Sequence, residues 1–194
     1  MLKRLSLAAA ILAAAAAPAF AHLDPAEHGS FLAGFSHPLF GADHILVMVA
    51  VGLWAVQIAS DSRRNALWTI PLAFVGTMAF GFLLALGGVT LPFVEPAILA
   101  SVIGLGLLVA TAVKLPVSAA ATIVGVFALF HGHAHGGELG PAGALEFGIG
   151  FMIATALLHA AGIVLGLGIA RFSPYTARIL GAGTALLGLS LAFA

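Results

Sequence analysis

The sequence predicts an all-α integral membrane protein with six transmembrane helices. The chain has 194 residues, of which 62% are hydrophobic and only 7% are charged, and its mean hydropathy is +1.17. This profile is typical of a polytopic membrane protein and not of a soluble domain. The formal net charge is zero and no basic patch occurs, so we expect the lipid bilayer as a partner and no nucleic acid.

The first apolar stretch has the organisation of a signal peptide. Two basic residues precede a short apolar run, and Ala19-Phe20-Ala21 forms a small-x-small cleavage site. An uncleaved anchor is the alternative, but the run is too short to span a bilayer comfortably. We therefore expect residues 1–21 to be removed, which leaves one six-helix domain over residues 22–194 that begins with His22.

Six apolar segments in the mature chain are long enough to cross a bilayer. Short connections that contain charges, proline or glycine separate them. The expected spans are Pro38–Ala59, Ala66–Leu86, Pro96–Val113, Pro116–His133, Ala144–Ala170 and Thr176–Ala194.

The basic residues predict the orientation of these spans. All those of the mature chain lie in or next to the connections after the first, third and fifth spans: Arg63, Arg64, Lys114, Arg171 and Arg178. The positive-inside rule makes these connections cytoplasmic and both mature termini periplasmic. A cleaved signal peptide predicts the same orientation independently. The expected location is the bacterial inner membrane.

The first span opens with the motif His-Pro-Leu-Phe-Gly-Ala-Asp-His. Pro38 fits the first turn of a helix, so we expect His37 at the cap and the rest of the motif inside one helix. His37 and His44 would then lie within about 20° of each other on one face. Gly41 would leave that face open for a ligand or a neighbouring helix. Asp43 could complete a metal shell or orient an imidazole.

A second histidine-rich stretch follows at the end of the fourth span. It contains His131, His133, His135 and Glu138, and the predicted topology places it at the same membrane face as the first motif. If the helix continued, His131 and His135 would be one turn apart and could chelate one ion. The flanking glycines make a loop an equal alternative. Two donor clusters at one face predict one shared site.

Other polar groups are candidates for the same route. His159 lies deep in the fifth span, where a charged group costs roughly 2.5–3.5 kcal/mol, so we expect it to face the bundle interior as a ligand or as an interhelical hydrogen-bonding group. His22 could collect metal outside the membrane. Participation of Met48 and Glu146 stays open.

The residue chemistry limits what such a site can hold. The chain contains no cysteine, which excludes disulfides and thiolate metal sites. Imidazole with carboxylate suits Ni²⁺, Co²⁺, Zn²⁺ or Cu²⁺, so the ligand set alone does not select the metal. We expect no tightly bound cofactor, because a transported ion must be released again.

At these motifs the sequence resembles the HupE/UreJ family of nickel permeases. The matching features are the first motif, the run Val-Gly-Leu-Trp-Ala over residues 51–55, the stretch 130–138 and the run 150–159. The resemblance covers the whole chain. It implies a bacterial inner-membrane secondary permease, not an enzyme, that takes up Ni²⁺, with Co²⁺ as a second cargo, from periplasm to cytoplasm. It also implies an association with hydrogenase or urease maturation.

The resemblance assigns metal ligation to specific positions: His37, Asp43 and His44, then His131, His133, His135 and Glu138, then His159, with His22 at the mature N-terminus. Two alternatives from the residue chemistry stay open, namely a zinc-dependent intramembrane hydrolase and a bis-histidine haem protein. The physiological metal, the energy source and a homo-oligomeric state are also left open.

Overall fold

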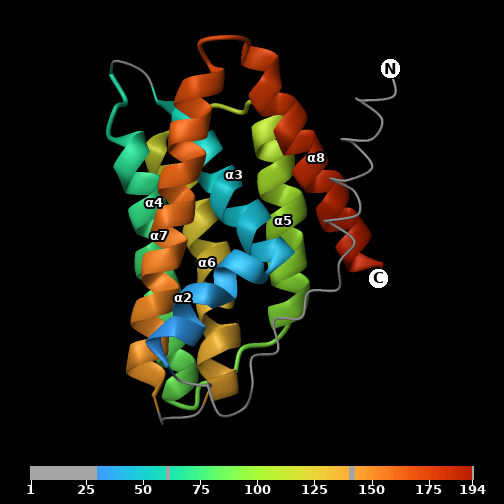
Figure 1. The fold of residues 1–194 in the computed structure, drawn as a ribbon. Helices are drawn as coiled ribbons and strands as arrows, with labels where there is room; N and C mark the ends of the chain where they lie inside the picture. The colour runs from blue at the N-terminus through green and yellow to red at the C-terminus, as the bar shows by residue number, and fades with distance from the viewer. Residues whose placement is uncertain (1–29, 60–61, 140–142, 194) are drawn as a thin grey trace.

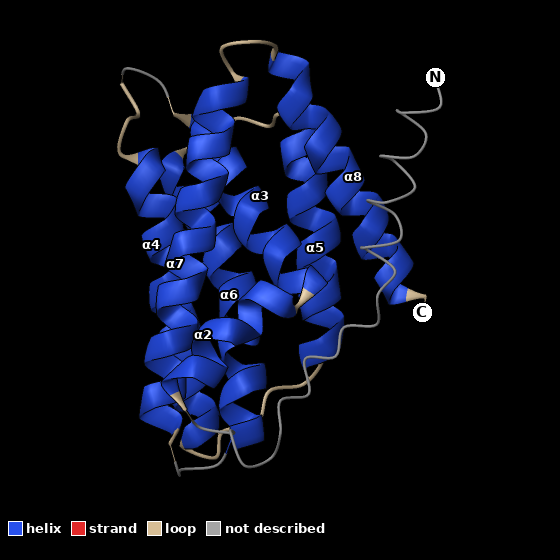
Figure 2. Cartoon of the chain, viewed as in Figure 1, coloured by secondary structure: helices blue, strands red, loops and turns tan. Residues whose placement is uncertain are grey.

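The computed structural model describes residues 30–59, 62–139 and 143–193. These ranges form seven helices and no strand (Figures 1 and 2). The expected signal peptide and His22 lie outside the described residues. The helices are α2 Phe31–Phe40, α3 Ala42–Ile58, α4 Ala66–Leu86, α5 Val94–Thr111, α6 Val117–Leu139, α7 Ala144–Ile169 and α8 Pro174–Ala192.

The helices from α3 onward form an up-and-down bundle. The connections after α3, α5 and α7 lie at the top of Figure 1, and those after α4 and α6 lie at the bottom. All arginines and the one lysine of the described residues lie in these top connections or next to them. The bundle therefore has one basic end and one end without Lys or Arg among the described residues.

The number of predicted spans is confirmed only in part. Four helices, α4, α5, α6 and α7, are long and apolar enough to cross a membrane by themselves. The bent pair α2 and α3 adds a fifth if both helices belong to one span. α8 packs along α5 but is not among these helices, since Tyr175, Thr176 and Arg178 make its first turns polar.

The prediction of one continuous first span over Pro38–Ala59 is wrong. The helix axis bends by 80° between α2 and α3. His37 lies in the last turn of α2, whereas Asp43 begins α3. Gly41 is extended at the junction: its N–H donates to the carbonyl of His37 and its own carbonyl accepts from Ile45. One residue thus ends one helix and starts the next.

The second histidine-rich stretch is helical, so the loop alternative is excluded. α6 continues to Leu139 because its glycines pack directly on α4. A Cβ on Gly132 would overlap the carbonyl of Met78, and one on Gly136 would contact the carbonyl of Phe82. Glycine here permits close helix packing instead of ending the helix.

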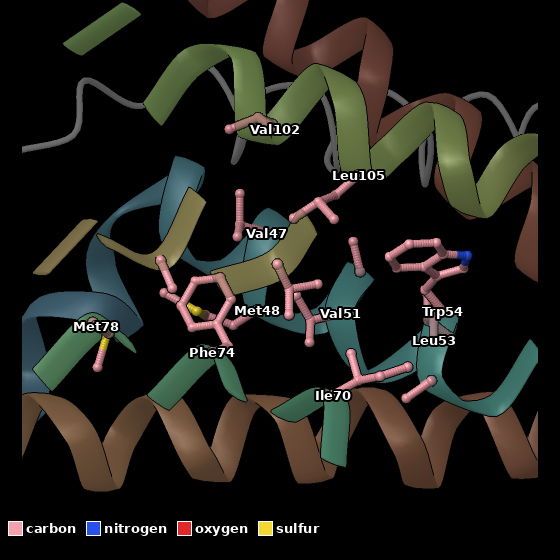
Figure 3. Packing of buried hydrophobic residues seen from close by; sticks show 14 of the residues in the cluster. Val47, Met48, Val51, Leu53, Trp54, Ile70, Phe74, Met78, Val102 and Leu105 are labelled. Carbon is pink, nitrogen blue, oxygen red and sulfur yellow. The ribbon is translucent and has the colours of Figure 1, made fainter. Parts of the chain in front are cut away.

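The interior of the bundle is apolar around α3. Figure 3 shows Met48 and Trp54 of α3 packed among Phe74 of α4 and Leu105 of α5. Trp54 is fully buried, and its indole N–H donates to the carbonyl of Val113 at 2.9 Å. Large apolar side chains also cover the outer surface, including Trp68, Leu72, Val164 and Leu186, as expected for a surface in contact with lipid.

Close packing of α7 on α3 depends on glycine. A Cβ on Gly162 would overlap the carbonyl of Val49, and Gly162 also faces Gly52 across the interface. Gly166, one turn later, lies against Val56. This interface fixes the position of α3, which carries His44.

We predict that Gly162→Ala destabilises the protein by about 1–3 kcal/mol, because α3 and α7 must separate to admit the methyl group. Gly168→Ala is the matched control on the same helix, where nothing lies within 4 Å of an added Cβ. Thermal unfolding of both purified variants in detergent, followed by circular dichroism, measures the difference. Equal midpoints for both variants would contradict the packing role of Gly162.

Candidate metal site

Three histidines from three helices converge inside the bundle. His37 of α2, His44 of α3 and His135 of α6 each offer one ring nitrogen, and these three atoms lie within 4.8 Å of one another. The two closest, Nε2 of His44 and Nε2 of His135, are 2.8 Å apart. His44 and His135 are buried and His37 is partly exposed. We call these residues the three-histidine cluster.

The break at Gly41 creates the cluster. On one straight helix His37 and His44 would be about 10 Å apart along the axis at 1.5 Å per residue. Across the bend their ring centroids are 5.1 Å apart. A Cβ on Gly41 would lie 2.8 Å from Nδ1 of His44 and 3.0 Å from Oδ1 of Asp43. Gly41 therefore makes room for these two side chains.

Asp43 lies behind His44. Its Oδ2 is 2.9 Å from Nδ1 of His44. The contact is close but is not aligned as a hydrogen bond, so its effect is mainly electrostatic. A carboxylate beside Nδ1 favours the proton on that nitrogen and leaves the Nε2 lone pair for a metal. Asp43 is also the one formal charge among the residues that form or contact the cluster in the described ranges.

His131 adds a fourth imidazole next to the cluster. It is fully buried, and its ring centroid is 5.3 Å from that of His44. Ser101 donates its hydroxyl proton to the carbonyl of Ile98, so its Oγ must accept the proton of His131 Nε2 at 2.9 Å. This assigns the lone pair of His131 to Nδ1, which is buried and has no hydrogen-bond partner among the described residues.

Aromatic rings surround the histidines. The Phe151 ring of α7 lies 4.9 Å from His135, 5.9 Å from His44 and 6.0 Å from His37, measured between centroids. Phe147 also contacts His37. An apolar wall of this kind limits the access of water and strengthens electrostatic interactions inside the site.

His159 lies apart from the cluster, on α7. It is 1% exposed, and neither of its ring nitrogens has a hydrogen-bond partner in the described part of the chain. Its ring is 5.0 Å from that of Phe74, which in turn lies 5.8 Å from His131. The Phe74 ring thus contacts both His159 and His131 of α6.

The remaining candidates lie elsewhere. His133 points away from the cluster and donates Nε2–H to the carbonyl of Val89 at 2.7 Å. Glu138 belongs to the last turn of α6. Glu146 is exposed in the first turn of α7, and Met48 is a core residue. The structure brings none of His133, Glu146 and Met48 into the three-histidine cluster, and the side chain of Glu138 lies outside the described part of the chain.

Sequence reasoning missed two residues that shape the site. Ser101 is a hydroxyl residue in the middle of the apolar helix α5, whose other hydroxyl residue, Thr111, ends the helix, and this position could have marked Ser101 as a partner for a buried polar group. Phe151 carries no such signal, because one phenylalanine among the 14 of the chain is ordinary in a membrane span.

The geometry is suited to a divalent transition metal. Two nitrogens bound side by side on an octahedral ion, with bonds of about 2.0–2.1 Å, lie about 2.9 Å apart. In the structure, Nε2 of His44 and Nε2 of His135 form a hydrogen bond at 2.8 Å, so these two nitrogens already face each other at about this separation. Three neutral imidazoles fill only part of the coordination shell of such an ion and leave further coordination positions for water or a carboxylate. A site of this kind can exchange its ion.

Comparisons with known proteins agree with these features. The family model described as HupE / UreJ protein matches residues 9–191. Protein HupE of Rhizobium leguminosarum bv. viciae is 46% identical over 187 residues, which cover 93% of this chain and 94% of that protein. No solved structure matches. The chain therefore belongs to the HupE/UreJ family, a family of nickel and cobalt transporters and not of enzymes.

Proposed function

We propose that this protein is a secondary permease that carries Ni²⁺, with Co²⁺ as a second cargo, from the periplasm to the cytoplasm through the three-histidine cluster. The observation that carries the proposal is the convergence of three imidazole nitrogens within 4.8 Å at a helix break inside a membrane bundle. The imported metal would supply hydrogenase or urease maturation.

The cluster has the properties of a transit site. It contains no thiolate, because the chain has no cysteine, and the carboxylate of Asp43 lies beside it. Such a site binds less tightly than the closed tetrahedral sites of structural zinc, and it can release its ion. His37 is more exposed than His44 and His135, which gives the ion a point of first contact.

The charge of the two ends supports the proposed direction of transport. The basic end of the bundle is cytoplasmic by the positive-inside rule. The cluster is built from the start of α3 and the end of α6, which belong to the opposite half. The ion would then enter from the periplasm. In the protein without its signal peptide, His22 and Glu138 would lie near the entrance.

We further infer that His159 is the next ligand on the route. A buried imidazole with two unpartnered nitrogens can accept an ion without first giving up a hydrogen bond. Its ring contacts Phe74, which also contacts His131. The ion would pass from the cluster by way of His131 to His159 and on toward the basic end.

The two alternative functions are less favourable. Family membership does not support a hydrolase. In a bis-histidine haem the axial nitrogens stand about 4 Å apart, on opposite sides of the iron, with bonds of about 2.0 Å. Nε2 of His44 and Nε2 of His135 are 2.8 Å apart in a hydrogen bond, a separation that does not match axial ligation of a haem iron by this pair.

The first test compares two histidines of the same helix. We predict that His135→Ala lowers uptake of radioactive nickel at trace concentration at least tenfold in nickel-starved cells, because one of three ligands is lost. His133→Ala should keep at least half of the uptake, since its ring contacts a backbone carbonyl outside the cluster. Membrane levels of both variants are measured by immunoblot.

Equal loss in the two variants at equal membrane level would contradict the special role of the cluster. Asp43→Asn in the same assay checks the carboxylate, whose charge favours both the cation and the required tautomer of His44. Cobalt, zinc and copper as competitors establish the order of metal preference.

His159→Gln tests the second ligand. We expect this variant to lower the maximal rate of nickel uptake several-fold while the concentration for half-maximal uptake changes less than twofold, because capture at the cluster is intact. Uptake measured over a range of nickel concentrations separates the two parameters. A variant with normal maximal rate and normal membrane level would exclude His159 from the route.

A further inference from the structure

A cavity lies at the basic end of the bundle, away from the three-histidine cluster. Its volume is about 350 Å³, and residues of α3, α7 and α8 line it together with the connection after α5. Lys114 and Arg178 supply its charge. None of its lining residues is acidic or a histidine, so the cavity repels a divalent cation and is not suited to metal.

The polar groups of this cavity favour an anion with a hydroxyl donor. Arg178 donates Nε–H to the carbonyl of Ala110 at 2.8 Å, which fixes the guanidinium and leaves its terminal nitrogens available for another acceptor. Lys114 adds a second positive charge. The hydroxyl groups of Ser173 and Tyr175 lie on the same lining.

Gln57 lines the cavity on the α3 side. Its Nε2 donates to the carbonyl of Val109 at 3.0 Å, and this bond fixes the orientation of the amide. The protein encloses its Oε1, so a molecule in the cavity does not contact that atom.

The rest of the lining is apolar. Leu53 and Val56 of α3 and Gly166 and Ile169 of α7 belong to this apolar part of the lining. Free phosphate would leave these walls without a partner. A molecule with an anionic head and a hydrocarbon chain would satisfy both parts of the lining, and basic pockets between transmembrane helices at the cytoplasmic side are known sites for anionic lipid headgroups.

We propose that this cavity binds an anionic phospholipid of the phosphatidylglycerol type. Its phosphate diester pairs with Lys114 and Arg178. One acyl chain lies along the walls that α3 and α7 form. The lipid thereby joins α3, the helix of His44, to α8, the helix of Arg178.

The test measures lipid retained by the purified full-length protein. Native mass spectrometry follows binding of phosphatidylglycerol and of zwitterionic phosphatidylcholine in detergent, with and without millimolar inorganic phosphate. The double variant Lys114→Gln with Arg178→Gln removes the proposed charges. Arg171→Gln is the matched control, since Arg171 is exposed at the same end and does not line the cavity.

We expect wild type and Arg171→Gln to retain one phosphatidylglycerol in preference to phosphatidylcholine, and the double variant to bind it roughly tenfold to thirtyfold more weakly.

Three results would overturn the proposal: equal retention of both lipids by wild type, equal loss in the double variant and in Arg171→Gln, or binding of inorganic phosphate without binding of phosphatidylglycerol. Circular dichroism of each variant verifies the helical fold. Loss of retained lipid counts for the proposal only in a variant with a wild-type spectrum.

Discussion

The 80° break between α2 and α3 is the constraint on which the site depends. It lets one short motif place His37 and His44 on two different helices that meet at a point, so that both rings turn toward His135 of α6. Gly41 is required at the break, because any side chain there would collide with His44 and Asp43. The same residue therefore determines both the backbone path and the position of the imidazoles.

The glycine-mediated helix packing supports this geometry. α6 can bring His131 and His135 into the interior because Gly132 and Gly136 let it approach the backbone of α4. α3 is held in the same way by Gly162 of α7. In a bilayer, where burial of apolar surface does not drive helix association, such close contacts and buried hydrogen bonds carry much of the packing energy.

Much of this structure could be predicted from the sequence, because apolar length and charge are strong signals in a membrane protein. Ala66–Leu86 was predicted with the bounds that the structure shows, and the alternation of basic and non-basic ends also agrees. The structure brings His37 and His44 of the first motif together with His135 of the second histidine-rich stretch, and metal binding there stays a prediction. The helix break was not predictable, because Gly41 fits the interior of a helix as well as its end, and tertiary contacts decide between them.

The central claim is that the imidazoles of His37, His44 and His135 together bind the transported ion. X-ray absorption spectroscopy of the purified protein loaded with one equivalent of nickel tests it most directly, because multiple scattering from imidazole rings counts the histidine ligands. The account predicts about three imidazoles per nickel in the wild type and about two in His135→Ala. A shell of oxygen ligands alone, or an imidazole count unchanged by this substitution, would contradict it.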